Sequence, residues 1–302
     1  MPRKLNRREF IYRSVGAGAG TILLGKASFS KNNNVKISLK DPLQIINLGK
    51  TGIKTTFLGM GTGFNGGNRS SNITRAGVAE TMIRQAFDKG IRFFDCADTY
   101  GTHAFAAAAL KNIARDKYTL VTKMWVGQGG LPETERPDAF AIVDRFRKEF
   151  NTDYIDLVQL HCMTDRLWTD KQKRYLDDLE TIKSRGVIKA HGVSVHSLEA
   201  MQAAAESDWV DVVHVRINPY GEAMDRKDPA EVLPVIEKIH KSGKGIIGMK
   251  LIGNGNFRDD SEKIDKSLKF VLDLGTIDLI TVGFEKPEQI DNYLLRIKSA
   301  IG

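Results

Sequence analysis

GIRFFDCADTYG, residues 90–101, places a hydrophobic strand directly before a carboxylate, Asp95, and a phenol, Tyr100, in a loop that contains glycine. A strand end that presents an acid and a phenol together suits proton transfer. A phenol with a pKa near ~10 in water donates a proton at neutral pH once a nearby cation lowers that pKa. This stretch therefore predicts a catalytic site at the end of a strand.

Two further polar residues end the next two apolar runs. Lys123 closes YTLVTK, and His161 closes YIDLVQLH. Taken singly, each of the four side chains has a structural explanation: a loop cap, a solvated strand end, a buried histidine or a rim aromatic. Together they lie at the same end of three successive strands, which indicates an active site on a parallel barrel. Asp95, Tyr100, Lys123 and His161 are therefore the candidate catalytic residues.

Strand-like and helix-like segments alternate from residue 57 to the C-terminus. Eight apolar runs, from FLGMGT at 57–62 to IDLITVGF at 277–284, each precede an amphipathic stretch. This alternation predicts an α/β fold, a (β/α)8 TIM barrel. Two short strands around a Lys-Thr-Gly turn, LGKTGIKTTF at 48–57, precede it. A doubly wound Rossmann sheet is the alternative, but no G-x-G-x-x-G follows the first strand.

The four strand-end residues, in this order, resemble the tetrad of the aldo-keto reductase family from about residue 46 to the C-terminus. The resemblance implies that Tyr100 protonates a carbonyl oxygen while a nicotinamide delivers hydride, with alcohol oxidation as the reverse. Lys123 would stabilise the phenolate, Asp95 would keep the lysine ionised, and His161 would orient the carbonyl. The early hairpin resembles the β-hairpin plug that closes the barrel floor in this family.

The resemblance also implies a nicotinamide pocket. Ser194 matches a carboxamide contact, whereas His214 stands where a Gln is expected. Met249 replaces the ring-stacking Tyr, and a thioether can still cover the nicotinamide face. The remaining implied cofactor contacts near this end are Gly61, Thr62, Asp95, Lys250 and Gly253.

The last strand and helix, TVGFEKPEQIDN, resemble the clamp on the adenosine phosphate. Gly283 is retained, Gln289 occupies the place of an Arg that grips the 2′-phosphate, and Asn292 is a plausible adenine contact. A bidentate guanidinium is the strong reader of phosphate. The implied cofactor is NADP or NAD.

Four aromatic or imidazole side chains are candidates for contact with substrate. Aromatic rings at the barrel mouth can stack on the apolar face of a sugar or on a flat ring, although rim packing explains each of them equally well. They are His103, Trp125, Trp168 and Tyr220. No metal is expected, because the two cysteines, Cys96 and Cys162, form no C-x-x-C motif. Each cysteine directly follows a tetrad residue, so strand alternation predicts that it points toward the helix layer.

Residues 1–30 resemble a twin-arginine export signal. Arg7 and Arg8 precede a short apolar stretch, which is too short to be an anchor by the ~20-residue criterion. A short basic tail on a cytoplasmic enzyme is the alternative. The segment holds six of the 45 basic residues and one of the 37 acids, so its removal lowers the net charge from +8 to +3. A mature chain of that charge gives no reason to expect nucleic acid as a partner.

The sequence thus predicts three parts: a signal at 1–30, a linker at 31–42, and an aldo-keto reductase-like barrel at 43–302. The expected protein is a periplasmic oxidoreductase that acts on a carbonyl/alcohol pair, with carbohydrates as candidate substrates. The twin-arginine translocase would carry it folded, with no stable membrane anchor, and its cofactor would be retained. The alternatives are a dinucleotide-binding sensor without turnover and a barrel hydrolase or lyase, which would need a carboxylate pair or metal cluster.

Overall fold

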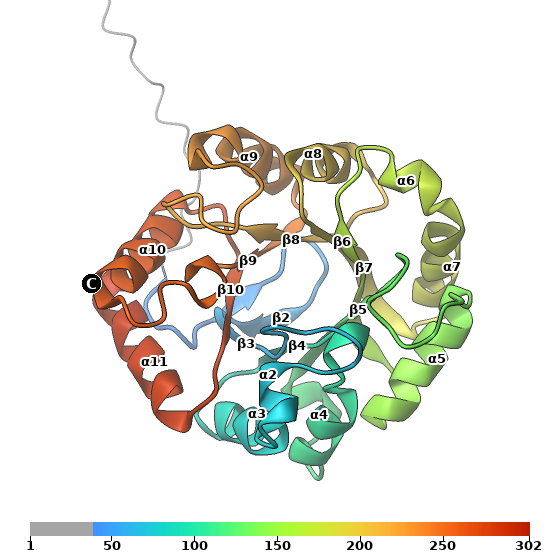
Figure 1. The fold of residues 1–302 in the computed structure, drawn as a ribbon, viewed down its shortest axis with the longest axis horizontal. Helices are drawn as coiled ribbons and strands as arrows, with labels where there is room; N and C mark the ends of the chain where they lie inside the picture. Colours follow the sequence, from blue (N-terminus) through green and yellow to red (C-terminus); the bar gives the residue numbers. More distant parts are fainter. Residues whose placement is uncertain (1–38) are drawn as a thin grey trace, which may run out of the picture. The chain divides into compact units, whose positions relative to one another are not determined.

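The computed structural model describes residues 39–302. The predicted export signal at 1–30 and most of the predicted linker lie outside the described residues. Eight parallel strands close into a barrel in the order β10-β3-β4-β5-β6-β7-β8-β9, inside a ring of helices (Figure 1). The predicted (β/α)8 barrel is therefore confirmed. Its strands are β3 (Leu58–Gly61), β4 (Phe93–Asp95), β5 (Thr119–Met124), β6 (Ile155–Met163), β7 (Ile188–Val195), β8 (Val212–Arg216), β9 (Gly245–Met249) and β10 (Leu279–Gly283).

The helices cover the outside of the barrel with their apolar faces, and most match the amphipathic stretches of the sequence within a few residues. They are α2 (Asn72–Arg75), α3 (Ala79–Asp88), α4 (His103–Ala109), α5 (Ala139–Phe150), α6 (Trp168–Lys171), α7 (Lys173–Ser184), α8 (Leu198–Glu206), α9 (Leu233–Ser242), α10 (Ser261–Leu274) and α11 (Pro287–Ile301). Short 3-10 turns add η1 (Asp98–Tyr100), η2 (Arg115–Lys117), η3 (Pro229–Glu231) and η4 (Gly253–Gly255). Among residues 39–302, no helix combines the length and the apolar character that crossing a membrane requires.

The predicted N-terminal hairpin is present as β1 (Ile45–Asn47) paired with β2 (Lys54–Thr56). Its turn lies against the amino-terminal ends of β9 and β10. The Gly49 N–H donates to the Asp278 carboxylate at 3.1 Å, and that carboxylate also accepts the Ile246 N–H at 2.9 Å. Burial raises the pKa of Asp278 to about 6. One carboxylate therefore ties the hairpin to the barrel floor and leaves the opposite, carboxyl-terminal end of the barrel open for a site.

Glycine makes the return from helix to strand possible at two positions on that floor. Gly243 ends α9 at φ +83°, and Gly275 ends α10 at φ +64°, both in the left-handed region. A side chain there would cost conformational strain, which glycine avoids. These joints set the direction of β9 and β10, whose carboxyl ends carry much of the candidate cofactor site.

Candidate active site

The four predicted catalytic residues lie together at the carboxyl end of the barrel. Asp95 ends β4, Tyr100 ends the turn η1, Lys123 lies in β5 and His161 in β6. The buried Lys123 ammonium donates to the Asp95 carboxylate and, at 3.1 Å, to the Cys96 carbonyl oxygen. The Tyr100 hydroxyl lies 3.3 Å from His161 Nε2. Carboxylate, lysine, phenol and imidazole therefore form one contiguous cluster.

Burial governs the protonation of this cluster. Burial alone would raise the pKa of Asp95, but the charge of Lys123 and the adjacent His214 lower it well below its usual value. Burial raises the pKa of Tyr100 well above that of an exposed phenol, and the Asp95 carboxylate adds to this effect. Burial also lowers the pKa of His161 far enough to keep the imidazole neutral at pH 7. The site thus holds an ionised Asp–Lys pair beside a protonated phenol.

The expectation that Lys123 lowers the phenol pKa is not met in this geometry. The Lys123 Nζ lies 5.3 Å from the Tyr100 ring centroid, while its charge is directly compensated by Asp95. A neutralised cation exerts little net field on a neighbouring group. Tyr100 therefore keeps its proton, which suits a proton donor.

Trp125 and Tyr220, two of the predicted substrate contacts, lie near loop ends with different surroundings. The Trp125 ring meets the His161 ring edge-on at 5.5 Å, and its Nε1 donates to the Gly129 carbonyl oxygen at 2.6 Å. Tyr220 is 37% exposed and packs edge-on against Phe257. Trp125 therefore adjoins the tetrad, whereas Tyr220 is a rim residue.

His103 and Trp168 do not face the barrel mouth, so the prediction that they contact substrate is wrong. His103, at the start of α4, is buried between the Glu149 carboxylate at 2.6 Å and the Thr122 hydroxyl at 2.7 Å. Trp168, at the start of α6, is buried and donates to the Ala200 carbonyl oxygen at 3.2 Å. Both were expected at the barrel mouth. Each is instead the first residue of a helix, and its side chain packs in the helix layer.

Ser194 and His214 lie side by side on β7 and β8, next to tetrad residues. Ser194 Oγ accepts the Cys162 N–H at 2.8 Å. His214 is fully buried, with Nε2 3.5 Å from the nearer Asp95 carboxylate oxygen, too long for a strong hydrogen bond. Cys162 has φ +64°, where β6 loses its register with β7, and its Sγ lies 3.1 Å from His196 Nδ1. The irregular backbone overrides strand alternation, so the prediction that this thiol points into the helix layer is wrong.

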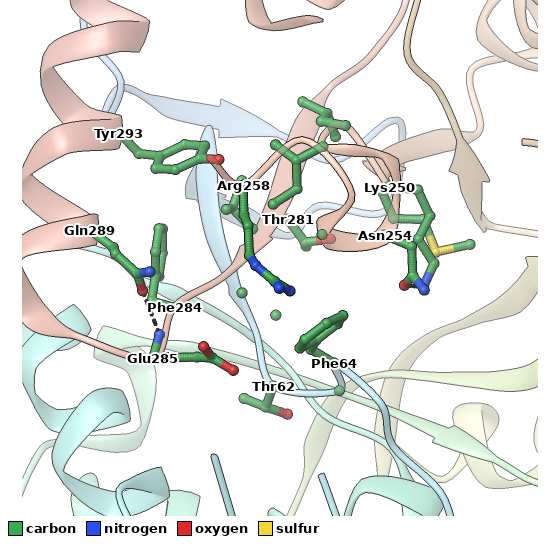
Figure 2. Close-up of a pocket in the computed structure, with 18 of the residues that line it drawn as sticks. Thr62, Phe64, Lys250, Asn254, Arg258, Thr281, Phe284, Glu285, Gln289 and Tyr293 are labelled. Carbon is green, nitrogen blue, oxygen red and sulfur yellow. Dashed lines mark hydrogen bonds between the residues drawn. The ribbon is translucent and has the colours of Figure 1, made fainter. Parts of the chain in front are cut away.

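A cavity of about 440 Å³ adjoins the tetrad and extends to α11 (Figure 2). This volume lies within the range of ~300–1,000 Å³ that is usual for ligand sites. Most predicted cofactor contacts line it, together with two tetrad members, and they come from the ends of β3, β9 and β10 and from α11. These residues are Gly61, Thr62, Asp95, Tyr100, Met249, Lys250, Gly283, Gln289 and Asn292. Gly253 belongs to η4 beside the cavity, where its α-carbon faces Glu222 and Phe257 rather than the cavity.

Several lining residues were not predicted from the sequence. Phe64 follows β3, Arg258 follows η4, and Tyr293 lies on α11. Figure 2 shows the Arg258 side chain extending into the cavity, where Phe64 and Glu285 also lie. Phe64 and Arg258 lie in loops without periodicity or motif, so only the paths of these loops bring them to the cavity, whereas Tyr293 lies on the buried face of α11.

The amino end of α11 forms the far wall of the cavity and is capped from within the chain. Gln289 Oε1 accepts the N–H of Glu285 at 2.7 Å (Figure 2). It also accepts the N–H of Lys286 at 3.1 Å. The Glu285 carboxylate accepts a hydrogen bond from Asn72 Nδ2 at 2.9 Å. Arg296 also lines the cavity, but its guanidinium binds Asp265 at 2.6 Å. Two backbone donors just before the helix are therefore already used within the chain.

The residues present fit a nicotinamide dinucleotide. The cavity extends from the tetrad residues Asp95 and Tyr100 along the barrel rim to polar side chains at the amino end of α11. Within residues 39–302, both His214 nitrogens and Gln159 Oε1 are buried without a hydrogen-bond partner. Buried polar atoms are rarely left unsatisfied, and the His214 imidazole borders Asp95 at the cavity. No three His, Cys, Asp or Glu side chains in this part of the chain gather as metal ligands would.

Comparisons with solved structures place this fold among known barrels. A protein of Pseudomonas aeruginosa described as an aldo-keto reductase superimposes with a TM-score of 0.69 at 24% identity, over 88% of this chain and 100% of its own. The aldo-keto reductase AKR11C1 of Bacillus halodurans, in its holo form, gives 0.66 at 18% identity over 86% and 95%. At these identities the likeness concerns the fold alone.

Curated relatives share part of the chain. Aldo-keto reductase YhdN of Bacillus subtilis is 30% identical over 202 residues, which are 64% of this chain and 58% of the relative. The protein named Probable aldo-keto reductase 1 of Glycine max is 25% identical over 71% of this chain and 61% of its own length. D-arabinose 1-dehydrogenase of Saccharomyces cerevisiae is 33% identical over 42% and 39%. The chain thus spans about three fifths of the length of the first two relatives.

The family comparison covers the barrel from β3 to the end of α10. The model of the aldo/keto reductase family matches residues 57–275, which include all four tetrad residues. More than half of the chain is covered by this match. The chain therefore belongs to the aldo/keto reductase family.

Proposed function

We propose that this protein transfers hydride between a nicotinamide dinucleotide and a carbonyl/alcohol pair. One observation carries the proposal: the Asp95–Lys123 pair, the Tyr100 phenol and the His161 imidazole form one cluster that borders a cavity of about 440 Å³. A hydrolase or lyase would need a carboxylate pair or metal ligands. Among residues 39–302 no such metal cluster exists.

Side chains of the protein supply the proton and orient the substrate carbonyl. The bound dinucleotide would supply or accept the hydride. Tyr100 donates its hydroxyl proton to the carbonyl oxygen, and the neighbouring Lys123 and Asp95 fix the phenol environment. His161, neutral because burial lowers its pKa, presents a hydrogen bond to the same oxygen and sets its angle. Reduction needs Tyr100 in its protonated form, which burial favours by raising the pKa of the phenol.

The Tyr100→Phe variant tests the proton donor. It should reduce kcat by about 10²–10⁴-fold and leave dinucleotide binding within a few-fold, because the proton is lost while the cavity stays. The assay follows nicotinamide absorbance with D-arabinose and with nitrobenzaldehyde, and Tyr175→Phe on α7 is the matched control. A Tyr100→Phe enzyme that keeps more than a third of the wild-type kcat would sink the assignment. If the wild-type protein binds the dinucleotide but shows no turnover, the result would favour the alternative, a dinucleotide-binding sensor.

A carbohydrate is the substrate class we propose. The relative D-arabinose 1-dehydrogenase is named for a sugar substrate. In this chain Trp125 stands against His161, where its ring would meet the apolar face of a sugar bound at the tetrad. The indole N–H is held by the Gly129 carbonyl oxygen, so the ring orientation is fixed before substrate binds.

We further propose that NAD is preferred to NADP. Two carboxylates, Glu285 and Glu288, line the α11 end of the cavity, and the Gln289 amide oxygen already accepts the N–H groups of Glu285 and Lys286 just before that helix. A 2′-phosphate there would meet like charge and few free donors. Arg258 also lines the cavity and would attract a phosphate, but the Asp259 carboxylate lies 3.5 Å from its guanidinium.

Binding titrations test this preference without turnover. NADP⁺ should bind at least about tenfold more weakly than NAD⁺, which corresponds to ~1.4 kcal/mol. Glu285→Gln should narrow that gap, because one negative charge leaves the cavity wall. Glu237→Gln on α9, which pairs with Lys241 outside the site, should leave it unchanged. Equal affinities in the wild type, or a gap that Glu285→Gln leaves intact, would refute the preference.

We also propose that the cofactor is retained on the folded protein. Phe64 and Gly255 both line the cavity, one after β3 and the other in η4. A Cβ built on Gly255 would lie 3.1 Å from the Phe64 ring, so the ring already touches the loop backbone. We propose that this contact slows the escape of a ligand from the cavity. Retention over a cell generation needs nanomolar or tighter binding, about −12 kcal/mol.

Dialysis of natively purified protein tests retention. The dinucleotide should stay bound, as shown by absorbance and by mass spectrometry of the ligand after denaturation, because escape requires the two loops to part. Phe64→Ala should release it measurably faster, and Phe270→Ala on α10, outside the cavity, should not. Loss of the ligand with micromolar affinity, together with a need for stoichiometric added cofactor, would rule retention out.

Export by the twin-arginine route to the periplasm is proposed from residues 1–30, with the translocase as the transient partner. Changing Arg7 and Arg8 to lysine should leave the protein in the cytoplasmic fraction, since the pair is what the translocase reads. Changing Arg3 and Lys4 together to Gln is the control, because these basic residues lie outside the pair. An unchanged periplasmic fraction for the double-lysine variant would remove the export proposal.

A further inference from the structure

The turn that carries Tyr100 is bound by charged side chains that lie outside the cavity. We infer that Arg145 and Asp98 are positioning residues that fix the Tyr100 phenol against the tetrad. This inference rests on the proposed function, in which Tyr100 is the proton donor. Neither residue lines the cavity, so any effect on turnover must pass through the segments that the two residues hold in place.

Asp98 anchors this segment. It begins η1, two residues before Tyr100, and only 3% of it is exposed. Arg145 of α5 donates to both carboxylate oxygens, at 3.1 Å and 2.6 Å, and Arg69 donates its Nε–H at 3.0 Å. Bidentate guanidinium pairs combine strength with a fixed direction. The turn that ends at Tyr100 is therefore clamped to α5.

The opposite side of the phenol is backbone. A Cβ built on Gly63 would lie 2.2 Å from the Tyr100 ring, and one built on Gly66 would lie 2.5 Å from it. The ring therefore lies against a glycine loop that permits no side chain there. Arg69, at the end of the same loop, donates to Asp98 and brings its carbonyl oxygen against Gly101. One carboxylate thus fixes both the turn that carries the ring and the loop that contacts it.

The same set of side chains reaches the strand of Lys123. Arg145 also donates to Glu149 at 2.8 Å, and the other oxygen of Glu149 accepts from His103 Nδ1 at 2.6 Å. His103 Nε2 accepts from the hydroxyl of Thr122 at 2.7 Å, the residue before Lys123. The relay from Asp98 to Thr122 therefore fixes both the phenol and the lysine strand from the helix layer.

These contacts give His103 a definite protonation. Burial lowers its pKa, so the ring is neutral, with the Nδ1 proton on the Glu149 side and Nε2 free to accept. Burial would raise the pKa of Glu149, but the contacts with His103 and Arg145 outweigh it and bring the value to about 2. Every buried group of the relay is thus satisfied in one arrangement, and removal of Arg145 leaves Asp98 and Glu149 short of donors.

Kinetics of Arg145→Met test the inference. Displacement of the reacting group by about 1 Å can cost ~10²-fold, so we expect kcat to fall by about 10–10²-fold while KM and the dinucleotide Kd change less than threefold. Arg145→Lys should restore part of the loss, because one charged donor returns to Asp98. Arg147→Met, on the same helix and 3.9 Å or more from its nearest acids, should behave as wild type.

A double-mutant cycle separates positioning from general stability. In a Tyr100→Phe background, Arg145→Met should cost no further kcat, because the group that it positions has gone. An equal loss of kcat in both backgrounds would overturn the inference. If Arg145→Met does not fold, Asp98→Asn in the same two backgrounds gives the same test, since the amide keeps the shape. Failure of Tyr100→Phe alone to reduce kcat would instead count against the proposed function.

Discussion

The buried ion pair between Lys123 and Asp95 is the constraint on which the rest of the site depends. An ammonium that is 1% exposed is tolerated only if a counter-charge and further acceptors surround it, and Asp95 and the Cys96 carbonyl oxygen provide both. Burial and the Asp95 carboxylate raise the pKa of the phenol beside the pair, so the phenol keeps its proton, and burial lowers the pKa of His161, so its imidazole is neutral. The barrel interior thus carries one charged pair and two neutral hydrogen-bonding groups at its mouth.

Much of this arrangement could be predicted from the sequence, because it follows from strand ends. Parallel strands in a barrel place their carboxyl ends in one ring, so Asp95, Lys123 and His161 had to converge once the alternation of strands and helices was recognised. The hairpin followed from local turn chemistry in the same way. Interior positions obey period-two alternation, which makes them the most predictable part of such a chain.

The helix starts and loops could not be predicted in this way. His103 was predicted to contact substrate at the barrel mouth. It instead lies in the helix layer, because it bonds to Glu149 on α5 and Thr122 on β5. Cys162 departs from alternation at a backbone position with φ +64°. Arg258 and Phe64 reach the cavity only through the paths of loops with no periodic pattern. Contacts between residues distant in sequence determine where these side chains lie, and such contacts cannot be recognised from a single sequence.

The central claim is that Tyr100, and not His161, gives the proton. The pH dependence of carbonyl reduction in a single turnover, with dinucleotide already bound, tests it most directly. A phenol whose pKa is raised stays protonated through neutrality, so the rate should fall only on the alkaline side, far above the ~6.5 of an ordinary histidine. This alkaline limb should vanish in Tyr100→Phe. A limb with its midpoint at or below pH ~6.5 that survives in Tyr100→Phe would instead identify the His161 imidazole as the donor.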